Sequence, residues 1–177
     1  MLTLGASIND FGAVTGCADL ASEIPGFPFV QIHPFLWTQA SGMQDLGAVG
    51  TDFSGLPFGI NNSEQVVGAS CDDMGNCRAF VWQNGTMMDL NALVPANSPL
   101  YLAFASVIND AGEIAGQAMD KSTGALHAFV ATPIPAAAAA KFEPSSPDLS
   151  RPMVLPESVR EQLRHRLGFG ARSNGPR

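Results

Sequence analysis

The chain repeats one pattern at a period of about fifty residues, a length typical of units that bury their apolar surface only by stacking on neighbours. The segment ASINDFGAVTG at residues 6–16 returns as FGINNSEQVVG at 58–68 and as SVINDAGEIAG at 106–116. The matched isoleucines are Ile8, Ile60 and Ile108. We therefore expect one domain of similar units between residues 1 and 133.

Two further segments keep the same spacing. HPFLW at residues 33–37 recurs as RAFVW at 78–82 and as HAFVA at 127–131. GMQDLGAVG, which starts at Gly42, recurs as TMMDLNALV from Thr86. Each full unit thus contains the same short segments in the same order.

The first segment predicts a β-hairpin. An Asn opens the turn and hydrogen-bonds its own backbone, and a Gly supplies the left-handed residue that the turn needs before the chain reverses. The turn residues of the three copies are Asn9, Asp10, Gly12, Asn61, Asn109, Asp110 and Gly112. The strand before the turn ends in Ile, and the VVG-type, HAFVW-type and MxDL-type runs predict three further strands. Each unit is therefore expected to be a four-stranded antiparallel meander.

The third strand of each unit is apolar on both faces, which indicates a sheet packed between other sheets. Its aromatic residues are Phe35, Trp37, Phe80, Trp82 and Phe129. We expect them to fill the space between sheets, although a sugar-binding groove of exposed aromatics is an alternative. A β-propeller provides such neighbours from one repeated unit. A β-solenoid or a stacked sandwich is the alternative architecture.

The units are expected at about residues 6–50, 54–94 and 103–132. The third unit lacks an MxDL strand, while MLTLGA at the N-terminus aligns with MQDLGA from Met43. Residues 1–5 are thus a candidate closing strand for the third unit, paired with the strand of Phe129. The alternative is a fragment of a longer array that has lost upstream copies and an export signal. An uncovered edge at Phe129 would then allow self-association.

Charge differs between the repeat region and the C-terminal tail. Residues 1–140 contain twelve acidic residues against Arg78 and Lys121, whereas residues 141–177 contain seven basic and four acidic residues. Because phosphate contacts need clustered Lys and Arg, the acidic region is not expected to bind nucleic acid. No apolar run is long enough to span a membrane, and the N-terminus has no signal-peptide pattern.

The tail is expected to be separate from the repeat region. Residues 134–153 have the composition of a Pro/Ala/Ser linker, and residues 154–177 predict a basic amphipathic helix followed by a disordered end. Val159, Leu163 and Leu167 form an apolar stripe at four-residue spacing. Since a helix of about twelve residues is marginal alone, we expect it to be disordered until it docks on the acidic region or a partner.

The cysteines are too few for a disulfide scaffold and show no zinc-finger spacing. Cys71 and Cys77 flank the loop between the second and third strands of one unit, so we expect them to form a disulfide. Two free buried thiols are the alternative. Cys17 is expected to be unpaired.

No catalytic, metal or cofactor site is predicted. The Asn and Asp residues of the turns, Asn62 among them, could supply oxygens for calcium, but turn chemistry explains them and no spaced D-x-D-x-D ladder occurs. His33, Arg78 and His127 share one repeat position, which indicates equivalent packing roles. No G-x-S-x-G, H-E-x-x-H or phosphate loop is present, so we expect the protein not to be an enzyme. A hydrolase or lyase is the least favoured alternative.

Together these segments resemble the HAF-type bacterial extracellular repeats, whose triplet stands here as His127-Ala128-Phe129. The resemblance covers about residues 1–133. It differs where Glu64 replaces the turn glycine, Arg78 the histidine and Ala131 the tryptophan. It implies an extracellular or cell-surface location, although this chain has no signal peptide, and a non-catalytic role that is structural or ligand-binding.

The partner is expected to be an unknown protein or glycan. A carbohydrate-binding or small-ligand-binding propeller is the alternative function. In that case the turns and the linker from Ile24 to Ile32 are the candidate contact sites, because loops on rigid scaffolds often bind ligands.

Overall fold

The computed structural model describes residues 3–20, 31–134 and 151–167, with only the backbone described at 166 and 167. Its strands are β1 (Thr3–Ile8), β2 (Val14–Asp19), β3 (Ile32–Thr38), β4 (Gly42–Asp45), β5 (Ser54–Ile60), β6 (Val66–Cys71), β7 (Cys77–Gln83), β8 (Thr86–Asp89), β9 (Leu100–Ile108), β10 (Ile114–Asp120) and β11 (Leu126–Ala131). A 3-10 turn, η1 (Leu90–Ala92), follows β8, and the helix α2 spans Glu157–Leu167. The predicted all-β class with one short C-terminal helix is confirmed.

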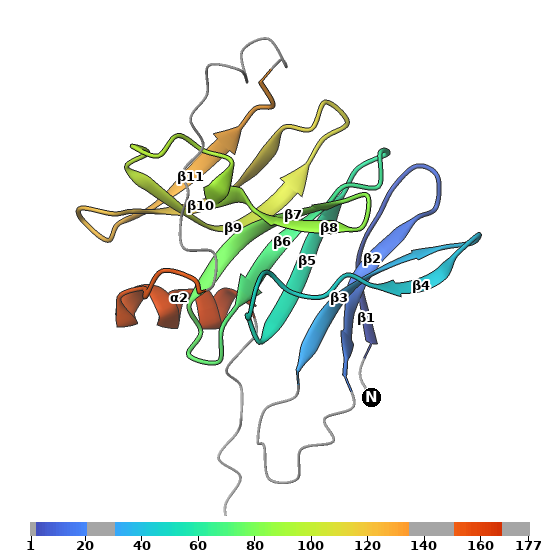
Figure 1. Cartoon of the computed structure of the whole chain (residues 1–177), viewed down its shortest axis with the longest axis horizontal. Coiled ribbons are helices and arrows are strands. Elements are labelled where there is room, and N and C mark those ends of the chain that lie inside the picture. The colour runs from blue at the N-terminus through green and yellow to red at the C-terminus, as the bar shows by residue number, and fades with distance from the viewer. Residues whose placement is uncertain (1–2, 21–30, 135–150, 168–177) are drawn as a thin grey trace, which may run out of the picture.

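The strands form three antiparallel sheets in chain order (Figure 1). The first sheet is β1-β2-β3-β4, the second is β5-β6-β7-β8, and the third is β9-β10-β11. The predicted order of segments within a unit is therefore the observed order of strands. Across residues 3–20, 31–134 and 151–167 the sheets do not close into a ring.

The first hairpin of each sheet has the same register. The residue before the turn pairs with the residue after it, as Ile8 does with Val14 and Ile60 with Val66. One extra residue interrupts the first strand at the same place in each sheet, at Ala6, Phe58 and Ser106. Such β-bulges bend a strand and increase its twist. The three units thus share backbone irregularities as well as sequence motifs.

The predicted closing strand is wrong for the residues that the structure describes. Thr3 and Leu4 belong to β1 and pair with Ala18 and Cys17 of β2, not with β11. A hairpin extends outward from its own turn with little loop-closure cost, whereas pairing with β11 would join distant segments. The likeness of MLTLGA to MQDLGA therefore does not reflect strand position, and β1 takes the same place as β5.

Apolar side chains gather in three clusters. One lies between the first and second sheets and contains Ala13, Leu36, Leu46, Val49, Ile60, Val66, Phe80 and Trp82. Another lies between the second and third sheets and contains Val67, Ala79, Val81, Leu90, Leu102, Ala105, Ile114, Ala118 and Phe129. The second sheet is covered on both faces, so β7 is buried along nearly its whole length. The prediction of a doubly buried third strand holds for this sheet.

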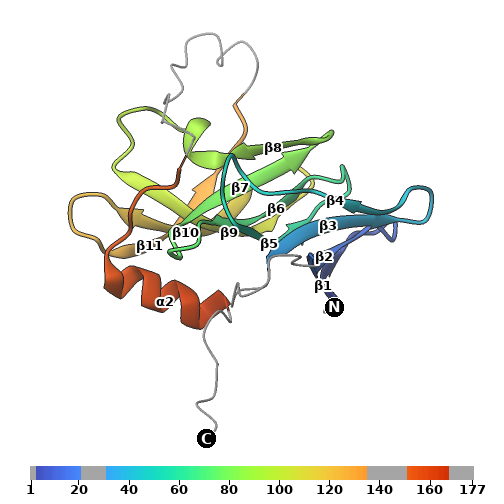
Figure 2. The same ribbon diagram turned by 60° about the horizontal axis from the view of Figure 1, so that its bottom comes forward.

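The third cluster joins the C-terminal segment to the second and third sheets (Figure 2). Leu155, Val159 and Leu163 are buried against residues that include Tyr101 and Phe104 of β9. The segment is therefore ordered and docked on the repeat region, the alternative to disorder. A helix too short to be stable alone is held by the apolar surface that it covers. The linker at 135–150, the side chain of Leu167 and the predicted disordered end at 168–177 lie outside the described residues.

Candidate functional site

The Asn residues that open the three turns have the geometry predicted from the sequence. Oδ1 of Asn9 accepts hydrogen bonds from the backbone N–H of Phe11 and Ala13, at 3.1 and 2.8 Å. Asn61 repeats both contacts, and Asn109 repeats the second. Gly12 and Gly112 have φ near +80°, and Glu64 takes the equivalent place at φ 58°. The second turn thus keeps the left-handed residue although its glycine is lost.

The same Asn side chains also connect one turn to the next. Nδ2 of Asn9 donates to the backbone carbonyl of Asn61 at 3.0 Å, and Nδ2 of Asn61 donates to that of Asn109 at 3.0 Å. Every link runs in one direction, from the amide of one unit to the carbonyl of the following unit. We call this series of contacts the turn ladder.

The residues after the Asn form a second row of the turn ladder. The backbone N–H of Asp10 donates to Asn62 Oδ1, and that of Asn62 donates to Asp110 Oδ1. Nδ2 of Asn62 lies between the two acids and donates to Asp10 Oδ2 at 2.8 Å and Asp110 Oδ2 at 2.9 Å. These acids therefore bond to neighbouring turns rather than to their own backbone. Among the described residues no group of three His, Cys, Asp or Glu side chains is placed to hold a metal ion.

The VVG-type and HAF-type motifs meet within each sheet. Gly16, Gly68 and Gly116 pair directly with Phe35, Phe80 and Phe129 of the adjacent strand. A Cβ at any of these glycines would lie 2.7–2.8 Å from the Phe ring and 2.0–2.1 Å from a carbonyl oxygen of the first strand. The glycine is thus required by close packing on both sides, which explains why the two motifs occur together.

His33 and Arg78, which share a repeat position, both contact the Asp of the MxDL segment. Nδ1 of His33 lies 3.0 Å from Asp45, and Nη1 of Arg78 lies 3.3 Å from Asp89. His127 is exposed on β11, in a sheet that has three strands in the described part of the chain. The shared position therefore supports the fourth strand of a unit.

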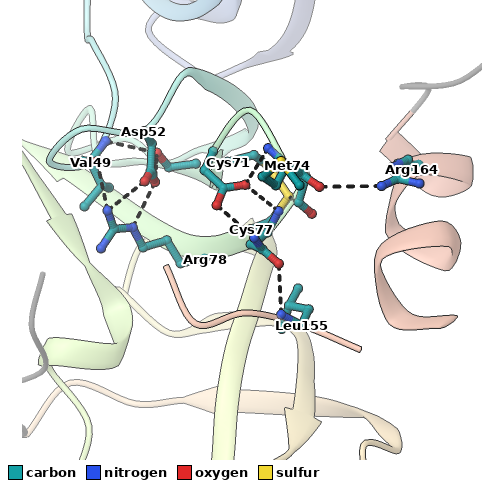
Figure 3. Close-up of a disulfide and its surroundings, with 12 residues drawn as sticks. Val49, Asp52, Cys71, Met74, Cys77, Arg78, Leu155 and Arg164 are labelled. Atoms are coloured by element: carbon teal, nitrogen blue, oxygen red, sulfur yellow. Dashed lines mark hydrogen bonds and ion pairs between the residues drawn. A yellow bond between two sulfur atoms is a disulfide. The ribbon is translucent and has the colours of Figure 1, made fainter. Parts of the chain in front are cut away.

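Arg78 is the centre of a buried polar network (Figure 3). Its side chain is 1% exposed, and it donates from Nε and Nη2 to the two oxygens of Asp52 at 2.9 and 2.8 Å. Nη2 also donates to the backbone carbonyl of Val49 at 3.0 Å, and Ser70 donates to Asp52 at 2.7 Å. Burial lowers the pKa of Arg78, but the hydrogen bond and charge of Asp52, with Asp89, more than offset it and raise that pKa.

The network continues into the third sheet. Asp89 accepts hydrogen bonds from the backbone and side-chain nitrogens of Asn91, at 2.7 and 2.9 Å. Asn91 in turn exchanges two hydrogen bonds with the backbone of Leu102 in β9. Asp52, Asp89 and Asn91 were not singled out by sequence reasoning. The recurrence of Asp45 at Asp89, opposite His33 and Arg78, is the signal that could have identified one of them.

Cys71 and Cys77 form the disulfide predicted from the sequence, with an S–S distance of 2.10 Å. The loop that it closes anchors the C-terminal segment (Figure 3). Asn76 Oδ1 accepts a hydrogen bond from the backbone N–H of Leu155 at 2.9 Å. Cys17 is a free, half-buried thiol, as expected. Burial, with a smaller contribution from the charge of Asp19, raises the pKa of Cys17 and lowers its reactivity.

Tyr101, the chain's only tyrosine, is expected to ionise only when the protein unfolds. Burial raises its pKa, and the hydrogen bond from the backbone N–H of Met153 lowers it by less, so the net shift is upward. The folded pKa thus exceeds the unfolded value of about 10, and stability is lost as pH rises above about 10. Ultraviolet absorbance of tyrosinate should rise together with loss of the circular dichroism of strands. Ionisation near pH 10 in a protein that is still folded would contradict this burial.

The aromatic residues singled out in the third strands differ in exposure according to their sheet. Phe35, Phe80, Trp82 and Phe129 are buried. Trp37, the equivalent of Trp82, is 38% exposed, whereas Trp82 is 6% exposed. The difference arises because the first sheet covers Trp82, while no described residues cover Trp37 in the same way. Packing between sheets accounts for Phe80, Trp82 and Phe129, whereas Phe35 is buried on a face where no other sheet packs within the described residues.

Comparisons with known proteins give no relative for this chain: a scan of protein-family models, a search of curated proteins and a search of solved structures each found no match. In the described part of the chain no helix has the length and apolar character needed to cross a membrane.

Proposed function

We propose that this chain is a non-catalytic repeat module of the HAF type, which acts outside the cell or at its surface in a structural or binding role. The observation that carries the proposal is the use of the recurring polar residues. Asn9, Asn61 and the polar residues that follow them join successive turns. His33 and Arg78 hold the fourth strands. Polar groups that recur in every unit thus serve assembly of the array rather than chemistry at one unit.

A propeller-like arrangement is part of this proposal. It is supported by sheets that pack in chain order, each with its first hairpin turn linked to the next by the turn ladder. The Cys71–Cys77 disulfide supports the extracellular location, because disulfides persist mainly in oxidising compartments. A protein that works outside the cell also benefits from a covalent link in a loop that anchors its C-terminal segment.

Carbohydrate binding is the second candidate function, and the exposure of two aromatic side chains favours it. Trp37 is partly exposed on the first sheet, and Phe11 is exposed at the tip of the first turn. Sugars bind to proteins by stacking on exposed aromatic side chains of this kind. Titration with soluble polysaccharides should then change tryptophan fluorescence, and Trp37→Ala should abolish the change while Trp82→Phe, a buried position, preserves it. A spectrum unchanged by any polysaccharide would remove this candidate.

The location can be tested in the organism that makes the protein. An antibody raised against the folded chain should label intact cells or detect the chain in the medium, and mass spectrometry of the native protein should find Cys71 linked to Cys77. Labelling only after lysis, with both cysteines reduced, would overturn the extracellular proposal. A cytosolic protein of the same cells serves as the control for lysis.

A further inference from the structure

The contacts between sheets show which face of a unit packs on which. In the second sheet, one face carries Ile60, Phe80 and Trp82, which pack against the first sheet. The opposite face carries Val67 and Val81, which pack against the third sheet. We call these the front face and the back face. The same alternation along β3 and β11 gives the other two sheets a front and a back face, and each front packs on the preceding back.

One front face and one back face pack on no other sheet within the described residues, although Phe35 on that front face is itself buried. On the front of the first sheet, Ile8 is 66% exposed, whereas its equivalent Ile60 is 7% exposed. On the back of the third sheet, Val130 is 72% exposed, whereas its equivalent Val81 is 5% exposed. Met43 on the front side and Val107 on the back side are exposed as well. In repeat proteins such end faces are usually polar caps, whereas these two expose apolar side chains, which lie beside the His33–Asp45 pair on the front face.

The two ends of the turn ladder also complement each other, because one end offers hydrogen-bond acceptors and the other offers donors. Apart from the side-chain amide of Asn62, which also donates back to Asp10, each link joins a donor in one unit to an acceptor in the next, so the first turn leaves acceptors and the last turn leaves donors. Within the described part of the chain, the carbonyl of Asn9 and Oδ1 of Asp10 receive no hydrogen bond from another unit. At the other end, Asn109 Nδ2 turns back to Glu113 in its own turn.

We propose that the open front face of one chain docks on the open back face of a second copy, and this inference rests on the structural role proposed above. We infer a second copy as the partner because each interface between sheets inside the chain already joins a front face to a back face. A second copy would continue the same packing. The contact is heterologous, because two different surfaces meet, so each copy can engage two others. Such contacts produce closed rings or open chains, depending on the rotation between copies.

The junction between copies differs from the internal links at one position. Asn62 separates Asp10 from Asp110 within the chain. Between copies, Asp110 of one chain would lie beside Asp10 of the next, with no amide between the two acids. Two carboxylates that lie side by side repel each other, and salt screens this repulsion only in part. The contact is therefore weakened by this pair, and removal of one charge should strengthen it.

Sedimentation velocity of the full chain over a range of concentrations tests the proposal. The front variant Ile8→Lys and the back variant Val130→Lys change exposed side chains, so both should retain the wild-type melting temperature. Because every contact needs one front and one back, either variant alone should associate at least about tenfold more weakly than wild type. An equimolar mixture should form a heterodimer, through the intact back of one variant and the intact front of the other.

Other results would overturn the inference. Wild-type protein that remains monomeric at high concentration removes the contact, while the surface location stays open to its own test. Association that persists in either variant alone indicates a symmetric contact or pairing of β11 edges. A mixture that forms no heterodimer leads to the same conclusion.

A gain-of-association variant tests the register of the junction. Asp10→Asn places an amide where Asn62 stands between units, and Asn62 keeps Asp110 as an acceptor. Association should tighten by roughly two- to fivefold, the scale of one exposed charge pair. Asp73→Asn makes the same charge change in the β6–β7 loop, where the side chain is exposed and lies outside the turn ladder, and should leave the affinity unaltered. An Asp10→Asn variant that associates no more tightly than wild type would overturn the alignment of the two turns.

Discussion

Replacement of Arg78 by alanine is expected to lower the free energy of unfolding by about 3–5 kcal/mol, the range for a buried ion pair broken from one side. The guanidinium is 1% exposed and holds both oxygens of Asp52, which is itself fully buried. Its loss leaves two carboxylates, Asp52 and Asp89, without their cation. It also removes the donor to the carbonyl of Val49, in the connection between the first and second sheets. Chemical denaturation followed by circular dichroism measures the change.

Two comparisons separate the buried charge from a general effect of lost basic residues. Lys121→Ala removes an exposed ammonium that donates to the carbonyl of Ser98, and the cost should be below about 1 kcal/mol. Arg78→Met combined with Asp52→Asn removes both charges and should recover part of the loss, because less uncompensated charge is buried. An Arg78→Ala variant as stable as Lys121→Ala would contradict the burial of the network.

The local structure could be predicted because it depends on neighbouring residues. The Asn at the start of each turn bonds the amide four residues ahead, and in the first two turns also the amide two residues ahead, so its role is contained within the turn. The left-handed residue follows from the same geometry. The Cys71–Cys77 link follows because both residues flank one hairpin loop. In each case the interacting residues are close in sequence, so the residue pattern leaves few possible partners for each.

Long-range partners could not be derived in this way. Asp52 reaches Arg78 from the β4–β5 connection and Asp89 from the end of β8, and their charges alone do not indicate which basic residue they meet. The position of β1 was misjudged because sequence likeness to Met43–Ala48 outweighed the cheaper local hairpin. The C-terminal helix was predicted, but its docked state was only an alternative, because its stability comes from Tyr101 and Phe104, which lie far away in the sequence.

In the turn ladder one Asn residue has two structural roles. Asn61 stabilises its own turn through Oδ1 and links to the next unit through Nδ2. The sequence indicates the first role, because the turn is local. The second role becomes apparent only when the units are packed, because it needs the carbonyl of Asn109 from a turn about fifty residues away.

Gly68→Ala is the second variant expected to be severely destabilised. A Cβ at this position would lie 2.0 Å from the carbonyl oxygen of Leu56 and 2.8 Å from the ring of Phe80. The bulge at Phe58 is adjacent, so β5 cannot shift without loss of its register with β6. Overpacking of a core costs about 1–3 kcal/mol where side chains can adjust. Because the closest obstacle here is a backbone atom, we expect Gly68→Ala to lower the free energy of unfolding by about 3 kcal/mol or more.

The matched control is Gly5→Ala, at a glycine in β1 where a Cβ would meet only Val14 Cγ1 at 4.0 Å. Its effect on the free energy of unfolding should be within about 0.5 kcal/mol, as for a substitution without a clash. Gly68→Ala with Phe80→Leu should recover only part of the loss, since the smaller side chain relieves the ring contact but leaves the carbonyl of Leu56 in place. A Gly68→Ala variant that unfolds like Gly5→Ala would show that β5 does not approach β6 so closely, and the shared glycine would then need another explanation.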